Sequence, residues 1–186
     1  RFQARCGELD RAGETPRPGE AAPLTPVLVV THGRMAQELL AAAETIAGVR
    51  PDIRALSLDW DEGSDAARAR IAQAVAELDR GEGVLILTDM FGSTPSNAAI
   101  ALAVPGKIEV VTGVNLPMVV RMSCSSVLPA TLVETARWLE EKGRRSICRG
   151  VAVDLAATSV AAVPPAPAAP LAPAKPPAPR ERPGCD

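Results

Sequence analysis

The chain contains a single histidine, His32, and its setting in the sequence suggests nucleophilic chemistry. His32 follows the short apolar run at residues 26–30 and Thr31, and Gly33 comes directly after it. A neutral imidazole has one nitrogen that donates a hydrogen bond and one that accepts. If a carboxylate holds the N–H, the other nitrogen keeps an exposed lone pair that can attack phosphorus. His32 is therefore a candidate phosphoryl acceptor, and Gly33 leaves room for the incoming group.

A carboxylate and two hydroxyl groups follow another apolar run. Asp89 comes shortly after the run GVLIL at residues 83–87 and opens a turn that contains Gly92, Ser93 and Thr94. A carboxylate at this place could orient the imidazole and stabilise it once it is phosphorylated. The two hydroxyl groups and the nearby backbone N–H groups form a candidate anion site opposite the ring.

Each of these residues also has an ordinary structural explanation. A lone histidine after a strand is more often a hydrogen-bonded structural residue than a catalyst. Asp89 could simply cap a turn, and the turn could be a loop before a helix with Thr94 as its cap and Pro95 at its first position. Asn115 could be the N-cap of a short helix. It is the placement of these features at the ends of strands that favours a site.

Apolar runs alternate with segments of helical periodicity along the middle of the chain, which indicates right-handed crossovers and a parallel sheet in an α/β fold. Both tryptophans, Trp60 and Trp138, are expected to be packing residues. Strands are predicted at residues 26–30, 53–58, 83–87 and 107–112. Helices are predicted from Met35 to Gly48, from Gly63 to Leu78, from Pro95 to about Ala103, from Asn115 onward, and from Pro129 to Lys142 with Gly143 as its end.

The carboxyl ends of parallel strands meet at one edge of a sheet, where ligands of such folds bind. The first predicted strand brings His32 to this edge, the third brings Asp89, and the fourth brings Asn115. If the sheet is doubly wound, the first and third strands are neighbours. The sequence therefore predicts that His32 lies beside Asp89.

Composition excludes several classes of function. The net charge of −2 shows no basic excess, so a nucleic-acid surface is not indicated. The four cysteines are far apart and form no CxxC pair, so neither a metal site nor a disulfide framework is expected, and the thiols fit a reducing cytoplasm. The sequence lacks phosphate-loop and dinucleotide-binding motifs and an aromatic pair for a flavin, so no cofactor is expected. It also has no apolar run long enough to span a membrane.

The two ends of the chain differ from its middle. Residues 1–24 are polar and rich in Gly and Pro, and we expect a disordered arm there. Half of the 18 prolines lie in residues 161–186, where they alternate with Ala. Residues 151–186 are therefore expected to be a semi-rigid Ala/Pro-rich tail or a truncated linker, and residues 25–150 a single domain.

Three separated segments resemble the enzyme IIA component of the mannose family of the bacterial phosphoenolpyruvate-dependent sugar phosphotransferase system (PTS). They are VLVVTHGRMAQELLAAAETIAG at residues 27–48, GVLILTDMFGSTPSNAA at 83–99 and VVTGVNLPMVVRM at 110–122. Their order and spacing agree with that family, and the resemblance covers roughly residues 26–150. It implies a flavodoxin-like three-layer sandwich, a homodimer, and a cytoplasmic protein that meets a membrane only through IIC and IID partners.

The resemblance also implies roles for the residues noted above. It makes His32 the phosphoryl acceptor, Asp89 the residue that orients it, and Thr94 a phosphate-binding hydroxyl, with phosphate contacts also expected from Gly33 and Ser93. Thr31, Gly92 and Asn115 fall on supporting positions of the family's loops. The family receives its phosphoryl group from the carrier protein HPr and passes it to a IIB domain, so a phosphotransferase component with a transient phosphohistidine is expected.

Two departures from the family pattern and three alternatives remain. Met90 stands where some members have Thr, and Ser93 stands where a second Gly is usual. The chain could serve sugar transport, or it could be a stand-alone regulatory IIA protein whose phosphorylation state controls a partner. A phosphotransfer subunit of the dihydroxyacetone-kinase type is ranked lower because the stretch TDMFGSTP is closer to the mannose type. A flavodoxin-like nucleotide- or flavin-binding domain is disfavoured by the missing motifs.

Overall fold

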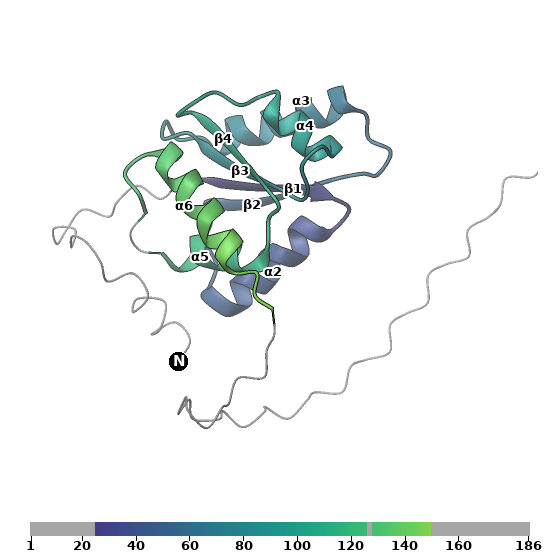
Figure 1. Ribbon diagram of the computed structural model, residues 1–186. Helices are drawn as coiled ribbons and strands as arrows, with labels where there is room; N and C mark the ends of the chain where they lie inside the picture. Colours follow the sequence, from purple (N-terminus) through teal and green to yellow (C-terminus); the bar gives the residue numbers. More distant parts are fainter. Residues whose placement is uncertain (1–24, 126–127, 150–186) are drawn as a thin grey trace, which may run out of the picture. The chain divides into compact units, whose positions relative to one another are not determined.

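Strands and helices alternate in the computed structural model, which describes residues 25–125 and 128–149 (Figure 1). The sequence prediction of an alternating α/β fold is confirmed. The expected arm over residues 1–24 and the expected tail over residues 151–186 lie outside the described residues. The elements are β1 (Val27–His32), α2 (Met35–Ala47), β2 (Ile53–Leu58), α3 (Ser64–Leu78), β3 (Val84–Thr88), α4 (Thr94–Ile100), β4 (Ile108–Thr112), α5 (Leu116–Cys124) and α6 (Leu132–Arg145).

The four described strands form one parallel sheet in the order β2-β1-β3-β4. The strands β1 and β3 are neighbours, as the doubly wound arrangement predicts, with Val30 opposite Thr88. On its other side β1 pairs with β2, where His32 lies opposite Leu58. The loops that follow β1, β2 and β3 therefore leave the sheet at the same edge.

Alternate residues of the central strands point to opposite faces of the sheet, and each face has its own apolar core. Val27 and Val29 of β1 pack with α2, α5 and α6, whereas Leu28 and Val30 pack with α3 and α4. Figure 1 shows the same division of the helices between the two faces. The two central strands, β1 and β3, are almost fully buried and consist mostly of aliphatic residues. This is expected for a parallel sheet that is covered by helices on both faces.

Helix α4 begins and ends differently from the sequence prediction. Its N-cap is Ser93, whose hydroxyl oxygen accepts a hydrogen bond from the backbone N–H of Ser96 at 3.3 Å. Thr94 is the first helical residue, so the prediction of Thr94 as the cap is wrong by one position. Regular α-helix ends at Ile100, and the chain continues to Ala103 in tighter i→i+3 turns.

The prediction that Gly143 ends the last helix is also wrong. Helix α6 begins with a capping box, in which Thr131 and Glu134 satisfy each other's backbone N–H groups, and it continues past Gly143 to Arg145. Gly143 instead serves the packing of α6 on α5. A Cβ atom at this position would lie 2.6 Å from the Sδ atom of Met118, which is closer than such atoms approach.

A buried ion pair fixes the sheet to α5 at the edge opposite to His32. Arg50 and Asp52 lie just before β2, and the Nε atom of Arg50 donates to Asp52 Oδ1 at 2.9 Å. The guanidinium also donates to the other oxygen of Asp52 and to the carbonyl of Met122 in the last turn of α5. The backbone carbonyl of Asp52 accepts from the N–H of Val27 at the start of β1. The ion pair thus joins β1, β2 and α5.

Candidate functional site

His32 and Asp89 lie together at the carboxyl edge of the sheet. His32 is the last residue of β1, and Asp89 directly follows β3. The Nδ1 atom of His32 lies 2.7 Å from Asp89 Oδ2, and the backbone N–H of His32 donates to the same oxygen at 2.9 Å. Each side chain is 13% exposed. The two residues that the sequence placed at neighbouring strand ends are therefore in direct contact.

The carboxylate of Asp89 accepts four hydrogen bonds. Its Oδ2 atom accepts the two from His32, and its Oδ1 atom accepts one from the backbone N–H of Met90 at 2.7 Å and one from the Ser93 hydroxyl at 2.9 Å. Burial raises the pKa of Asp89, but the hydrogen bonds from the backbones of His32 and Met90 and from the side chains of Ser93 and His32 outweigh it. The net effect is a pKa below the ordinary value of 3.8. Asp89 is therefore ionised at neutral pH.

An ionised carboxylate can only accept hydrogen bonds, and this fixes the tautomer of His32. Nδ1 must carry the proton that it shares with Asp89, so Nε2 of the neutral ring keeps its lone pair. Nε2 is thereby available as a nucleophile, while Asp89 can stabilise a positive charge that develops on the ring. The arrangement can accept a group on Nε2 without moving a proton.

Thr31 holds the end of β1 to the start of α2. Its buried hydroxyl accepts a hydrogen bond from the backbone N–H of Ala36 at 2.8 Å and lies 3.2 Å from the carbonyl oxygen of His32, to which it donates. The supporting position expected for Thr31 therefore corresponds to a structural contact that fixes the turn between His32 and α2. Among the described residues, no hydrogen bond joins the Thr31 hydroxyl to the imidazole ring.

Trp60 belongs to the site, contrary to the sequence prediction that it is a packing residue. Its side chain is 80% exposed, and its indole is stacked on the imidazole of His32 with ring centroids 4.7 Å apart and planes inclined by 8°. One sequence signal could have found it. Trp60 follows β2 by two residues, so the strand-end rule that placed Asp89 beside His32 also brings Trp60 to this edge. Trp138, in contrast, packs partly buried against the core, as predicted.

Gly33 permits the turn after β1 and lies against the side chain of Trp60. Its φ angle of +53° lies in the left-handed region that side chains disfavour. A Cβ atom on it would lie 3.4 Å from the Nε1 atom of Trp60. The backbone N–H of Gly33 donates to the carbonyl of Leu58 at 2.8 Å, which fixes this turn to the end of β2. These features explain a glycine at this position, and phosphate binding by Gly33 stays a prediction.

The turn before α4 is held by its own hydrogen bonds. The N–H of Gly92 donates to the Ser96 hydroxyl at 3.0 Å, and the side chain of Asn97 donates to the carbonyl of Gly92 at 3.1 Å. The Ser93 hydroxyl is already engaged by Asp89 and by the cap of α4. Within the described structure the hydroxyl of Thr94 has no hydrogen-bond partner. Of the two expected phosphate-binding hydroxyls, that of Thr94 is therefore the one left available for a ligand.

Asn115 is the N-cap of α5 and lies apart from the imidazole. Its side-chain oxygen accepts from the backbone N–H of Met118 at 3.1 Å, and its amide donates to the carbonyl of Gly143 at 3.4 Å. These two bonds join α5 to α6. In the part of the chain that the structure describes, Asn115 forms no hydrogen bond with His32 or Asp89, so its observed role is in the scaffold.

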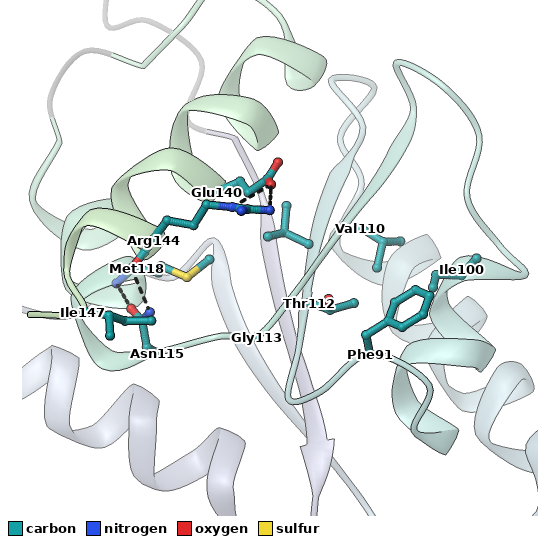
Figure 2. Close-up of a pocket in the computed structure, with 12 residues that line it drawn as sticks. Phe91, Ile100, Val110, Thr112, Gly113, Asn115, Met118, Glu140, Arg144 and Ile147 are labelled. Atoms are coloured by element: carbon teal, nitrogen blue, oxygen red, sulfur yellow. Dashed lines mark hydrogen bonds and ion pairs between the residues drawn. The ribbon is translucent and has the colours of Figure 1, made fainter.

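A cavity of about 510 Å³ lies along β4, beside Asn115 (Figure 2). Met118 and Arg144 line it from α5 and α6, and Phe91 and Ile100 line it from the other side of β4. Neither His32 nor Asp89 is among its lining residues. This cavity is therefore separate from the candidate nucleophile.

Two features are absent from the described ranges 25–125 and 128–149. No group of three or more His, Cys, Asp or Glu side chains is placed to hold a metal ion. No helix in these ranges is long and apolar enough to cross a membrane.

Comparison with known proteins places the chain in a family. A family model described as PTS system fructose IIA component (EIIA-man) matches residues 26–138. The mannose-specific EIIAB component of Escherichia coli K12 is 31% identical over 142 residues, which are 75% of this chain and 44% of that protein. The sorbose-specific EIIA component of Lacticaseibacillus casei is 30% identical over 101 residues, or 54% and 72% of the two chains. This chain thus spans less than half the length of the EIIAB relative.

A solved structure supports the same assignment. The mannose/sorbose-specific IIA subunit from Enterococcus faecalis has a TM-score of 0.63 and 28% identity, and the match covers 72% of this chain and 99% of that one. The flavodoxin-like fold expected from the sequence is confirmed by this likeness and by the parallel sheet. On this evidence the chain belongs to the EIIA-man family, the mannose-type IIA components of the sugar phosphotransferase system.

Proposed function

We propose that this chain is a phosphocarrier that accepts a phosphoryl group on the Nε2 atom of His32. The contact of 2.7 Å between His32 Nδ1 and Asp89 Oδ2 carries this proposal, because it fixes the tautomer in which Nε2 is unprotonated. The ionised Asp89 then balances the positive charge of the phosphorylated ring. Thr94, with its available hydroxyl, is the proposed phosphate-binding side chain, and Gly33 and Ser93 are proposed to lie beside the group.

The proposed step is a direct transfer between two imidazoles. The lone pair of Nε2 attacks the phosphorus atom carried by the donor, and a new N–P bond forms. The N–P bond of the donor breaks, and its electron pair returns to the donor's ring nitrogen, which becomes neutral. The Nδ1 proton of His32 stays in its hydrogen bond to Asp89, so the transfer needs no separate acid or base.

Exposed apolar side chains around the site support a protein as the donor. Met35 follows His32 closely in the chain, Met90 and Phe91 follow Asp89, and Trp60 covers the ring, and all four are exposed. Large apolar groups gathered on a surface are typical of protein interfaces. We propose phospho-HPr as the donor, since the family resemblance implies it and this surface suits a protein rather than a small sugar.

The acceptor is proposed to be a IIB domain in sugar transport. The Escherichia coli relative is named an EIIAB component, and the Ala/Pro-rich segment of this chain is of the kind expected between two such domains. The protein would then act in the cytoplasm as a homodimer and meet the membrane only through IIC and IID partners. The alternative, a regulatory IIA protein, uses the same chemistry at His32 and differs only in what reads the phosphorylated state.

Labelling from radioactive phosphoenolpyruvate through enzyme I and HPr tests the carrier function. The full chain should take up a single acid-labile phosphoryl group, and His32→Ala should take up none. An exposed control, Arg34→Ala, removes a charge that among the described residues pairs with Glu38 on the surface, and it should retain the label. Label on the His32→Ala chain, or none on the natural chain, would refute the proposal.

A second measurement separates transport from regulation. Purified IIB domain should remove the label from the phosphorylated chain if the chain serves transport. Retention of the label with IIB present, together with a partner protein whose binding changes on phosphorylation, would assign the regulatory role instead.

A further inference from the structure

The indole of Trp60 covers one face of the imidazole that is proposed to carry the phosphoryl group. The two rings are nearly parallel, with planes 8° apart and centroids at 4.7 Å, a stacked arrangement that aromatic rings favour. Trp60 is also 80% exposed, so burial in the core does not explain its place. Asp89 holds the edge of the same imidazole through Nδ1. The ring is thus restrained at its edge by a carboxylate and on one face by an indole.

The loop that carries Trp60 is fixed by charged contacts to α3. The Oε2 atom of Glu62 accepts from the backbone N–H of Asp59 at 3.2 Å and from Arg70 at 2.5 Å. Arg70 also donates to the carbonyl of Ser57 at 2.9 Å. Because Glu62 is nearly buried, these bonds hold the turn on both sides of Trp60. The backbone that carries Trp60 is therefore fixed next to the end of β2, beside His32.

We propose that Trp60 is a positioning residue of the phosphoryl transfer: it keeps the His32 ring in the plane set by Asp89 and stabilises the ring while it carries the phosphoryl group. This inference rests on the proposed function. With Nδ1 protonated and Nε2 phosphorylated, the imidazole is positively charged, and the face of an indole attracts such a charge. The stack should therefore favour phosphohistidine over the free ring and slow its loss.

Spontaneous hydrolysis of the phosphorylated chain isolates this effect, because no partner takes part. Water attacks phosphorus, the N–P bond breaks with its electron pair returning to Nε2, and neutral imidazole and dihydrogen phosphate are formed. Trp60→Leu should shorten the half-life of phosphohistidine about two- to fivefold, the range expected for one exposed cation–π contact. Trp60→Phe should restore most of it, and the matched control Trp138→Phe should leave it unchanged.

Fluorescence gives a second readout that a purely structural role would not alter. In the Trp138→Phe chain the remaining indole, Trp60, should change its emission on phosphorylation. In the Trp60→Phe chain, which retains Trp138, the emission should stay constant. Circular dichroism of each variant checks that the fold is retained.

The outcomes separate this inference from the carrier function. If the natural chain is labelled at His32 but Trp60→Leu keeps the natural half-life, the positioning role is wrong and the carrier function stands. If Trp60→Leu alters only the KM for phospho-HPr and leaves the half-life unchanged, Trp60 is a docking residue and the inference is also wrong. Failure of His32 labelling in the natural chain would overturn the carrier function itself.

Discussion

His32 contacts one oxygen of Asp89 twice, through its backbone N–H at 2.9 Å and through Nδ1 at 2.7 Å. The first bond ties the end of β1 to the residue that follows β3. The second sets the tautomer of the ring. One carboxylate oxygen therefore couples the position of the main chain to the tautomer of the imidazole. Asparagine has nearly the size of aspartate but no charge, so Asp89→Asn tests the contribution of the charge.

Asp89→Asn should retain the fold but slow phosphorylation of His32 about 10- to 100-fold, the range expected for loss of one hydrogen bond to a charged group. The amide oxygen can still accept from His32, but it no longer balances a positive ring. Its NH2 group would also face the backbone N–H of Met90, which donates to Oδ1 in the natural chain. The initial rate of labelling by phospho-HPr measures the effect.

A matched control for this substitution is Asp65→Asn, because the Asp65 side chain is 95% exposed on the first turn of α3. It should label at the natural rate. Equal rates for Asp89→Asn and the natural chain would show that the carboxylate has no role in orienting His32.

The lowered pKa of Asp89 also predicts how stability depends on pH. Its folded-state pKa lies below 3.8, so the unfolded chain binds the proton first as pH falls. The contribution of the ionised carboxylate to the free energy of unfolding is thus fully present above that value and is lost as pH falls through the folded-state pKa. The difference between the natural chain and Asp89→Asn should shrink as the pH falls below about 4. Urea unfolding at a series of acidic pH values measures it, and a difference that grows below about pH 4 would contradict the prediction.

Ser93 has two roles that two substitutions can separate. It caps α4 and donates to Asp89. Ser93→Ala should lower the free energy of unfolding by about 1 kcal/mol through the lost cap, whereas a glycine cap costs only a few tenths. Both Ser93→Ala and Ser93→Gly remove the bond to Asp89, so they should slow labelling by a similar factor. Urea unfolding and labelling rates of the two variants test this, and a natural labelling rate in both would exclude a role of Ser93 in holding Asp89.

The pairing of His32 with Asp89 could be predicted from the sequence because it follows from topology. Parallel strands bring their carboxyl ends to one edge, and the first and third strands of a doubly wound sheet are neighbours. The same rule brings Trp60 to this edge, but it does not predict that the indole stacks on His32. It depends on the conformation of the loop after β2, which the contact between Glu62 and Arg70 fixes only in the folded chain.

The errors at helix ends have a similar cause. Ser93 and Thr94 are both good caps and lie next to each other, so local preference alone does not choose between them. The contact of Ser93 with Asp89 favours Ser93 in the structure. Glycine is common at helix ends, but Gly143 lies inside α6. A glycine is needed there because the Met118 side chain occupies the space that a Cβ atom would fill. Only tertiary packing distinguishes these two uses of glycine.

The buried pair of Arg50 and Asp52 should be sensitive to loss of one partner. Arg50→Met leaves the Asp52 carboxylate buried without its cation and should lower the free energy of unfolding by about 3–5 kcal/mol. The double variant Arg50→Met/Asp52→Asn should lose less than the sum of the single changes. Arg54→Met is the control, since its pair with Glu77 is about half exposed and should contribute under about 1 kcal/mol. Equal losses of the free energy of unfolding for the two arginine variants would show that burial does not make the Arg50–Asp52 pair more sensitive to the loss of its cation.

Gly143→Ala tests whether packing outweighs helix propensity in α6. Alanine is favoured over glycine inside a helix by about 1 kcal/mol. The new Cβ atom would, however, lie 2.6 Å from Sδ and 3.0 Å from Cγ of Met118, which is 2% exposed and packed in the core. Overpacking of this kind costs about 1–3 kcal/mol, so the substitution should lower the free energy of unfolding.

A double-mutant cycle shows whether Met118 is the cause of that loss. In the Met118→Ala background the clash is removed, and Gly143→Ala should become neutral or stabilising by up to about 1 kcal/mol. The free energies of unfolding of the four chains in urea give the coupling between the two positions. If Gly143→Ala stabilises the chain while Met118 is present, the helices can move apart at no cost, and the close packing of α5 on α6 does not explain the glycine.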